Sequence, residues 1–121
     1  MSAAESSPRS PKECTDLGHV RVEIVRLDAA LVDLIGERFG YVERAWQIKL
    51  TENAEANVPW RNQQVIDRVR ARAAERGVPP ELCEALWRQM IGWFIQYEEE
   101  KLRSDIEAKG TNATGKPDGK S

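Results

Sequence analysis

The fold of this chain is decided by the stretch TDLGHVRVEIVRLDAALVDLIGERFGYVERAWQIKL, which runs from Thr15 to Leu50 and contains no proline. Apolar residues recur in it at steps of three and four, namely Leu17, Val20, Ile24, Leu27, Leu31 and Leu34. This spacing places side chains on one face of an α-helix. We therefore predict one long helix, in which Arg38 occupies the next position of the apolar stripe.

The predicted helix is longer than a compact chain of this size can cover. At about 1.5 Å per residue it extends over roughly 50 Å. A globular chain of 121 residues has a radius of gyration of only roughly 14 Å. We therefore expect the apolar stripe to be buried against other helices, including one from a second copy of the chain.

Composition places the chain in the all-α class. Its 121 residues suit a single domain with a modest core. Helix-forming residues dominate, and no run of alternating β-branched residues indicates a strand. We divide the chain into a disordered N-terminal segment over 1–13, a helical domain over 14–108 and a flexible C-terminal tail over 109–121.

A second, shorter helix is predicted after the first. The polar stretch 51–58 is typical of a surface loop, and Pro59 suits the first turn of a new helix. We expect this helix over Trp60 to Arg76, ended by Gly77. Its inner face is predicted to carry Val65, Ile66, Val69 and Ala73.

A third helix is predicted to open at Pro79 and Pro80 and to fade towards Gly110. Two adjoining lines of apolar residues run along it. The first line contains Leu82, Leu86, Met90, Trp93 and Tyr97, and the second contains Trp87, Ile91 and Phe94. Such a wide apolar face belongs inside a helical bundle.

Charge and hydropathy exclude several classes of partner. The chain has 18 basic and 20 acidic side chains and a net charge of −2, so it lacks the basic excess that binding to a nucleic acid needs. The first residues lack the apolar segment of a signal peptide, and no run of roughly eighteen apolar residues suggests a membrane span. We expect a cytoplasmic protein with no nucleic-acid and no membrane partner.

The cysteines and the single histidine do not indicate a metal site. Cys14, Cys83 and His19 show no ligand spacing, and two cysteines do not make a disulfide framework. We therefore expect free thiols in a reducing compartment, with neither a metal nor a cofactor.

Several charged residues lie where the helical pattern calls for apolar ones. They are Arg38 in the stripe, Arg21 and Lys49 beside it, Arg61 at the start of the second helix, and Glu98 on the inner face of the third. Four cations and one carboxyl group that face a core predict a pocket for a small polyanion. The alternative is that these long side chains extend from the edge of the stripe into water.

The length of the first helix limits which cations can act together. Arg21 and Lys49 are roughly 42 Å apart along it, so they cannot bind the same small molecule within one chain. Arg38 and Lys49 are roughly 16 Å apart, which two long side chains can span. If Arg21 belongs to the same site, it comes from the other subunit of a two-fold dimer with two shared sites.

The segment VRVEIVRLDAALVDLIGERFGYVERAWQIK resembles the first helix of the all-helical class of chorismate mutases. The family pattern is an arginine, then Ile-x-x-Leu-Asp, then an arginine and a lysine, and it is matched in spacing by Arg21, Asp28, Arg38 and Lys49. Arg61 falls where the family has its second-helix arginine. Glu98 falls where many members carry glutamine and some carry glutamate. The resemblance implies a three-helix protomer (long, short, long), an intertwined homodimer and a shikimate-derived dicarboxylate substrate.

The start of the chain, ECTDL followed by VR, is also similar to the isochorismate pyruvate lyases, a branch of the same fold that makes salicylate. Three positions depart from the mutase pattern. Asn62 and Val58 stand where mutases often have acidic residues that help to hold the ring hydroxyl, and Phe94 stands where a small serine is common. Isochorismate and amino-substituted relatives of chorismate therefore stay open as substrates.

The resemblance implies a role for each residue in the rearrangement of chorismate to prephenate. This concerted reaction needs shape and charge rather than a nucleophile. Arg38 and the other subunit's Arg21 would bind the two carboxylates, with Arg61 as support. Lys49 would contact the ether oxygen and its neighbouring carboxylate. Glu98 would be the second donor to the ether oxygen, for which its carboxyl must be protonated.

Two other functions stay open beside the mutase. A lyase would use the same cations to fold isochorismate for hydrogen transfer and loss of pyruvate. A non-catalytic dimeric helical interaction module would use Arg38 as an ion-pair partner at its interface.

Overall fold

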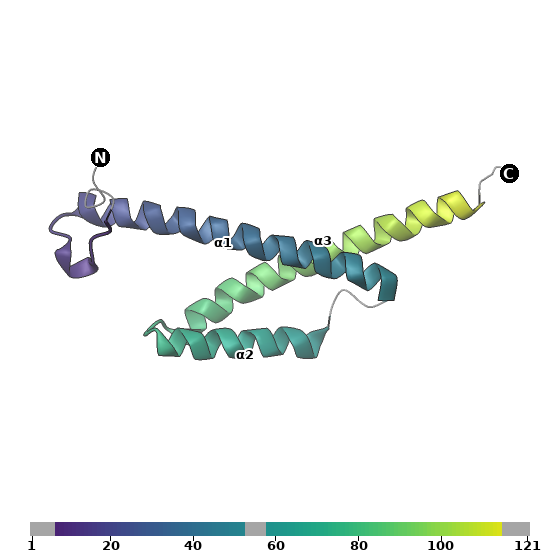
Figure 1. Ribbon diagram of the computed structural model, residues 1–121. Helices are drawn as coiled ribbons and strands as arrows, with labels where there is room; N and C mark the ends of the chain where they lie inside the picture. The colour runs from purple at the N-terminus through teal and green to yellow at the C-terminus, as the bar shows by residue number, and fades with distance from the viewer. Residues whose placement is uncertain (1–6, 53–57, 115–121) are drawn as a thin grey trace. The chain divides into compact units, whose positions relative to one another are not determined.

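The computed structural model describes residues 7–52 and 58–114 and is helical throughout its regular elements (Figure 1). A short 3₁₀ helix, η2, spans Pro11–Glu13, and α1 spans Leu17–Glu52. They are followed by α2 over Pro59–Glu75 and α3 over Pro80–Thr114. The described ranges contain no strand, so the predicted all-α class and the order of long, short and long helices are confirmed.

The helix bounds differ from the predicted ones at both ends of the chain. The structure has η2 inside the segment that we expected to be disordered, where Ser10 N–H donates to Glu13 Oε1 over 2.8 Å. Helix α3 continues to Thr114, past the expected end near Gly110. Parts of the predicted N-terminal segment, loop and tail, namely 1–6, 53–57 and 115–121, lie outside the described residues.

The start of α1 is capped by Asp16. Asp16 Oδ1 accepts the backbone N–H of His19 over 2.9 Å, which satisfies one of the free donors of the first turn. This hydrogen bond lowers the pKa of the Asp16 carboxyl. His19 is engaged locally, because its Nδ1 accepts the backbone N–H of Thr15 over 3.1 Å.

The chain divides into two compact units, Met1–Tyr41 and Val42–Ser121. In the first unit, the apolar stripe of α1 is exposed within a single chain. The exposed fraction of Leu31 is 56% and that of Leu34 is 61%, and α1 has no buried residue. The predicted stripe is therefore present, but one chain does not bury it.

The second unit contains a hairpin of α2 and α3, which lie side by side in Figure 1. Gly77 ends α2 with a φ of 73°, a left-handed conformation that favours glycine. Gly77 N–H donates to the Ala74 carbonyl over 3.2 Å, and Val78 N–H donates to the Ala73 carbonyl over 2.9 Å. These two bonds form a Schellman motif, which confirms the predicted stop.

The core of the second unit is small. Ile66 and Ala73 of α2 are buried, as predicted, and α3 contributes Phe94 and Glu98. Of the two predicted apolar lines on α3, the line that ends at Phe94 faces this core. The other line is only partly covered within one chain, since Leu82, Leu86 and Trp93 are exposed whereas Met90 and Tyr97 are half-buried.

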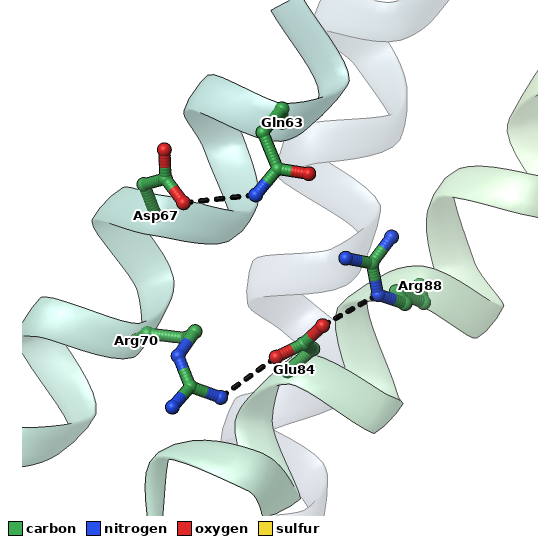
Figure 2. A network of polar contacts seen from close by, with 5 residues as sticks. All are labelled: Gln63, Asp67, Arg70, Glu84 and Arg88. Atoms are coloured by element: carbon green, nitrogen blue, oxygen red, sulfur yellow. Dashed lines mark hydrogen bonds and ion pairs between the residues drawn. The ribbon is translucent and has the colours of Figure 1, made fainter. Parts of the chain in front are cut away.

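A polar network joins α2 to α3 on the surface of the hairpin (Figure 2). Arg70 Nη1 of α2 donates to Glu84 Oε1 of α3 over 2.7 Å, and Arg88 Nε donates to Glu84 Oε2 over 2.6 Å. The guanidinium of Arg88, followed by that of Arg70, lowers the pKa of Glu84. Glu84 therefore acts as an ionised link between the two helices.

Candidate functional site

The centre of the candidate site is an ion pair between the end of α1 and the middle of α3. Lys49 Nζ donates to Glu98 Oε1 over 2.7 Å. The side chains are 22% and 10% exposed, respectively. Within residues 7–52 and 58–109, Glu98 is the one charged residue that the fold buries. The structure thus brings together two of the residues that the sequence singled out.

The hydrogen bond of this pair has a defined direction. The ammonium of Lys49 has donors and no acceptor, so the Glu98 oxygen that faces it accepts the hydrogen bond.

Glu98 has an aromatic neighbour on its own helix. Phe94 lies one turn earlier on α3, on the same face, and is 8% exposed. The ring of Trp93 meets it edge to face, with the centroids 5.2 Å apart and the planes at 90°. An apolar neighbour of this size lowers the local dielectric, which strengthens charge interactions at the pair.

The beginning of α2 holds three further predicted residues. The Val58 carbonyl accepts the N–H groups of Arg61 and Asn62, each over 3.0 Å, so this turn has a fixed geometry. Val58 and Asn62 are half-buried, whereas Arg61 is exposed. The Arg61 guanidinium donates to Gln64 Oε1 over 2.8 Å on the same helix.

The two remaining predicted cations belong to the first unit. Arg21 is exposed on the first turns of α1, and Arg38 is half-buried towards the end of that unit. That they act together with Lys49 and Glu98 stays a prediction.

A carboxylate that we did not single out also joins α1 to α3. Glu43 Oε1 accepts Trp46 Nε1–H over 3.0 Å, and Glu43 Oε2 accepts the hydroxyl of Tyr97. Glu43, Trp46 and Leu50 share one helical face by their spacing. The signal that could have revealed Glu43 was a charged residue on a helical face that also carries a tryptophan. The same criterion, a charge among apolar residues, selected Arg38.

Metal and membrane functions find no support in the part of the chain that the structure describes. No cluster of three or more His, Cys, Asp or Glu side chains is placed to hold a metal ion there. Cys14 and Cys83 are free thiols. None of the described helices has the length and hydropathy required to cross a membrane.

The fold and the ion pair define a three-helix all-α protein with a polar centre between its two long helices. Comparison with known proteins specifies the class further. Residues 20–99 match the model of the family described as Chorismate mutase type II, and the chain belongs to this family. An isochorismate pyruvate lyase from Pseudomonas aeruginosa is 32% identical to it over 87 residues, which cover 72% of this chain and 85% of that protein. The family match, first suggested by the spacing of Arg21, Arg38 and Lys49, is confirmed.

Proposed function

We propose that this protein is a chorismate mutase that converts chorismate to prephenate. The observation that carries the proposal is the Lys49–Glu98 pair, a shielded ammonium and carboxyl at 2.7 Å on two helices of a chain that belongs to the chorismate mutase type II family. The reaction is intramolecular and concerted, so it requires a folded substrate and stabilised charge rather than a nucleophile.

In the proposed mechanism, Lys49 donates to the ether oxygen as the bond to the ring breaks, and also contacts the neighbouring carboxylate. Glu98, protonated in the complex, donates to the same ether oxygen. Arg38 and the other subunit's Arg21 bind the two carboxylates, Arg61 supports this cluster, and Phe94 packs against the apolar face of the substrate. Donors that are fixed before the reaction stabilise the transition state without a cost of reorganisation.

The site is proposed to be shared between two copies of the chain. The exposed stripe of α1 includes Leu27, Leu31 and Leu34, which are 48%, 56% and 61% exposed, and a second copy supplies the matching face. A contiguous apolar face of this kind marks an interaction surface in a protein of this size. The other subunit's Arg21 would then complete the cation cluster, because roughly 42 Å of helix separates it from Lys49 in its own chain.

The second candidate function is an isochorismate pyruvate lyase. It is favoured by the similarity to the lyase from Pseudomonas aeruginosa and by Asn62 and Val58, which leave recognition of the ring hydroxyl open. A mutase that acts on an amino-substituted chorismate is a variant of the first proposal with the same cations.

A two-substrate product assay separates these functions. The purified protein is incubated with chorismate and, separately, with isochorismate, and prephenate and salicylate are measured by chromatography. We expect prephenate from chorismate at a rate that exceeds any release of salicylate from isochorismate. Salicylate as the main product would replace the mutase proposal with the lyase. Arg72→Ala serves as a control variant and should form the same products as the parent, since Arg72 pairs with Glu75 on the exposed side of α2.

The non-catalytic alternative is tested by binding. A bicyclic dicarboxylate that mimics the transition state should raise the Tm of the catalyst, because a ligand that binds only the folded state stabilises it. A helical interaction module without a substrate site should show no such increase. The absence of both turnover and a Tm shift would therefore support the interaction module.

A further inference from the structure

The carboxylate of Glu43 connects α1 and α3 inside the second unit. Tyr97 of α3 donates its hydroxyl to Oε2, while Trp46, on the same helix as Glu43, donates Nε1–H to Oε1 over 3.0 Å. The Trp46 bond lies within α1 and does not reach another helix. The Tyr97 bond joins the two helices.

The ring of Tyr97 is contacted by two further side chains of α3. Trp93 stacks on it with the centroids 5.3 Å apart and an interplanar angle of 13°. Lys101 Nζ lies 5.3 Å from the centroid of the same ring. Stacking and cation–π contacts of this kind restrict the ring, so the hydroxyl is a well-fixed donor.

Two links from α1 therefore reach adjacent residues of α3. Glu43 bonds to Tyr97, and Lys49 bonds to Glu98, the next residue in the chain. A single link between two helices leaves them free to rotate and slide about it, whereas two separate links fix both motions. The Lys49 ammonium sits on a flexible four-carbon stem, which does not fix its position by itself. The ammonium therefore stays at Glu98 only if the two helices that carry these side chains are held in place.

We propose that Glu43 is a positioning residue for the Lys49–Glu98 pair, acting through Tyr97. It sets the place of the last turns of α1 on α3, so that the ammonium of Lys49 and the carboxyl of Glu98 meet. The consequence for turnover rests on the proposed function, since it assumes that this pair is catalytic. A displacement of about 1 Å of a catalytic group can cost about a hundredfold in rate.

Four variants separate positioning from general stability. Tyr97→Phe removes the hydroxyl and keeps the stacked ring, and Glu43→Leu removes both acceptor oxygens. Glu43→Gln keeps an amide oxygen that can accept from Tyr97. Trp46→Phe is the matched control, because it removes the other bond to the same carboxylate, which lies within α1 and does not join the helices.

We expect Tyr97→Phe and Glu43→Leu to lower kcat by about tenfold or more with KM nearly unchanged, because the loss concerns the transition state rather than ground-state binding. Glu43→Gln should restore most of kcat, and Trp46→Phe should stay within about twofold of the parent. A loss of kcat in all four variants that follows the decrease in their Tm would overturn the proposal and indicate a structural role. Full activity in Tyr97→Phe would overturn it as well.

A second readout does not depend on turnover. The rate at which a small acylating reagent modifies Lys49 is measured by mass spectrometry in the full-length protein, relative to exposed Lys12. The Lys49 side chain is 22% exposed where it contacts Glu98, which limits access of the reagent, so the relative rate should rise at least about threefold in Tyr97→Phe and Glu43→Leu only. An unchanged rate in these two variants would overturn the positioning role. If the rate rises in these two variants but the parent converts no substrate, the proposed function is refuted and the positioning role stands.

Discussion

Lys49 Nζ donates to Glu98 Oε1 over 2.7 Å, and this bond joins the end of α1 to the middle of α3. A buried ion pair stabilises a fold only weakly, because desolvation offsets much of the Coulomb attraction. Glu98 is the one buried charged residue within 7–52 and 58–109, and a role in chemistry explains the pair better than a contribution to stability does. We assign that chemistry to the binding of a small dicarboxylate.

The first prediction concerns the ammonium of Lys49. Lys49→Met keeps the apolar stem and removes the charge, so kcat/KM for chorismate should fall by about a hundredfold or more, about 2.7 kcal/mol of transition-state stabilisation. Circular dichroism should show that the helices persist. Arg72→Ala, which removes an exposed ion pair of α2, should leave turnover unchanged. Activity of Lys49→Met within tenfold of the parent would exclude Lys49 from the site.

The second prediction concerns the exposed stripe of α1. Leu31→Glu puts a charge in the stripe and should convert a dimer into a monomer, as measured by light scattering after size exclusion. Val22, which is 60% exposed, lies on the opposite face of α1 by its spacing, so Val22→Glu is the matched control and should stay dimeric. A dimeric Leu31→Glu, or a parent that is monomeric at assay concentration, would contradict the proposed interface.

The third prediction concerns sharing of the site between subunits. Arg21→Ala and Lys49→Ala chains should each be inactive alone, because each homodimer lacks one cation in both sites. Mixed dimers should regain activity, since one of their two sites then carries both residues. Subunit exchange is verified by mass spectrometry of the mixture. Failure to recover activity after complete exchange would show that Arg21 acts elsewhere.

The fourth prediction concerns acid and the link between α2 and α3. Arg88, and then Arg70, hold the pKa of Glu84 below its ordinary value of 4.5. The unfolded chain therefore binds more protons at this residue, so its stabilising effect is present above the unfolded value and is lost as the pH falls through the folded value. Glu84→Gln should lower the Tm near neutral pH, and the difference should shrink as the pH falls below about 4.

Glu75→Gln is the control for this experiment. Glu75 pairs with Arg72 on a single helix, where both side chains are exposed, so the change should have little effect on the Tm at any pH. A Tm difference between Glu84→Gln and the parent that stays constant down to acid pH would show that Glu84 contributes through packing and not through its charge.

The helices were predictable because their signals are local. The three-and-four spacing from Leu17 to Leu34 defines α1, and the glycine at position 77 with the prolines that follow it defines the turn between α2 and α3. Which line of α3 faces inward was not predictable in this way. Leu82 and Phe94 both belong to helical apolar lines, and the packing of other helices against α3 decides that Phe94 is the buried one.

The candidate site was predictable for residues that break a pattern. Lys49 and Glu98 stood out because they are charges at apolar positions, and the structure pairs them. The link between Glu43 and Tyr97 depends on how α1 is placed on α3, which no spacing within one helix specifies. The grouping of Arg21 and Arg38 with this pair depends on a second chain and stays a prediction.

Glu98 as a hydrogen-bond donor to the ether oxygen is the centre of the proposed mechanism, and the turnover of two variants at this position is its most direct test. Glu98→Gln keeps an amide donor of nearly the same shape, so its kcat for chorismate should stay within about tenfold of the parent. Glu98→Ala removes the donor and should lower kcat by about a hundredfold or more. Full activity of Glu98→Ala, or a Glu98→Gln variant as poor as Glu98→Ala, would contradict the central role of the Lys49–Glu98 pair.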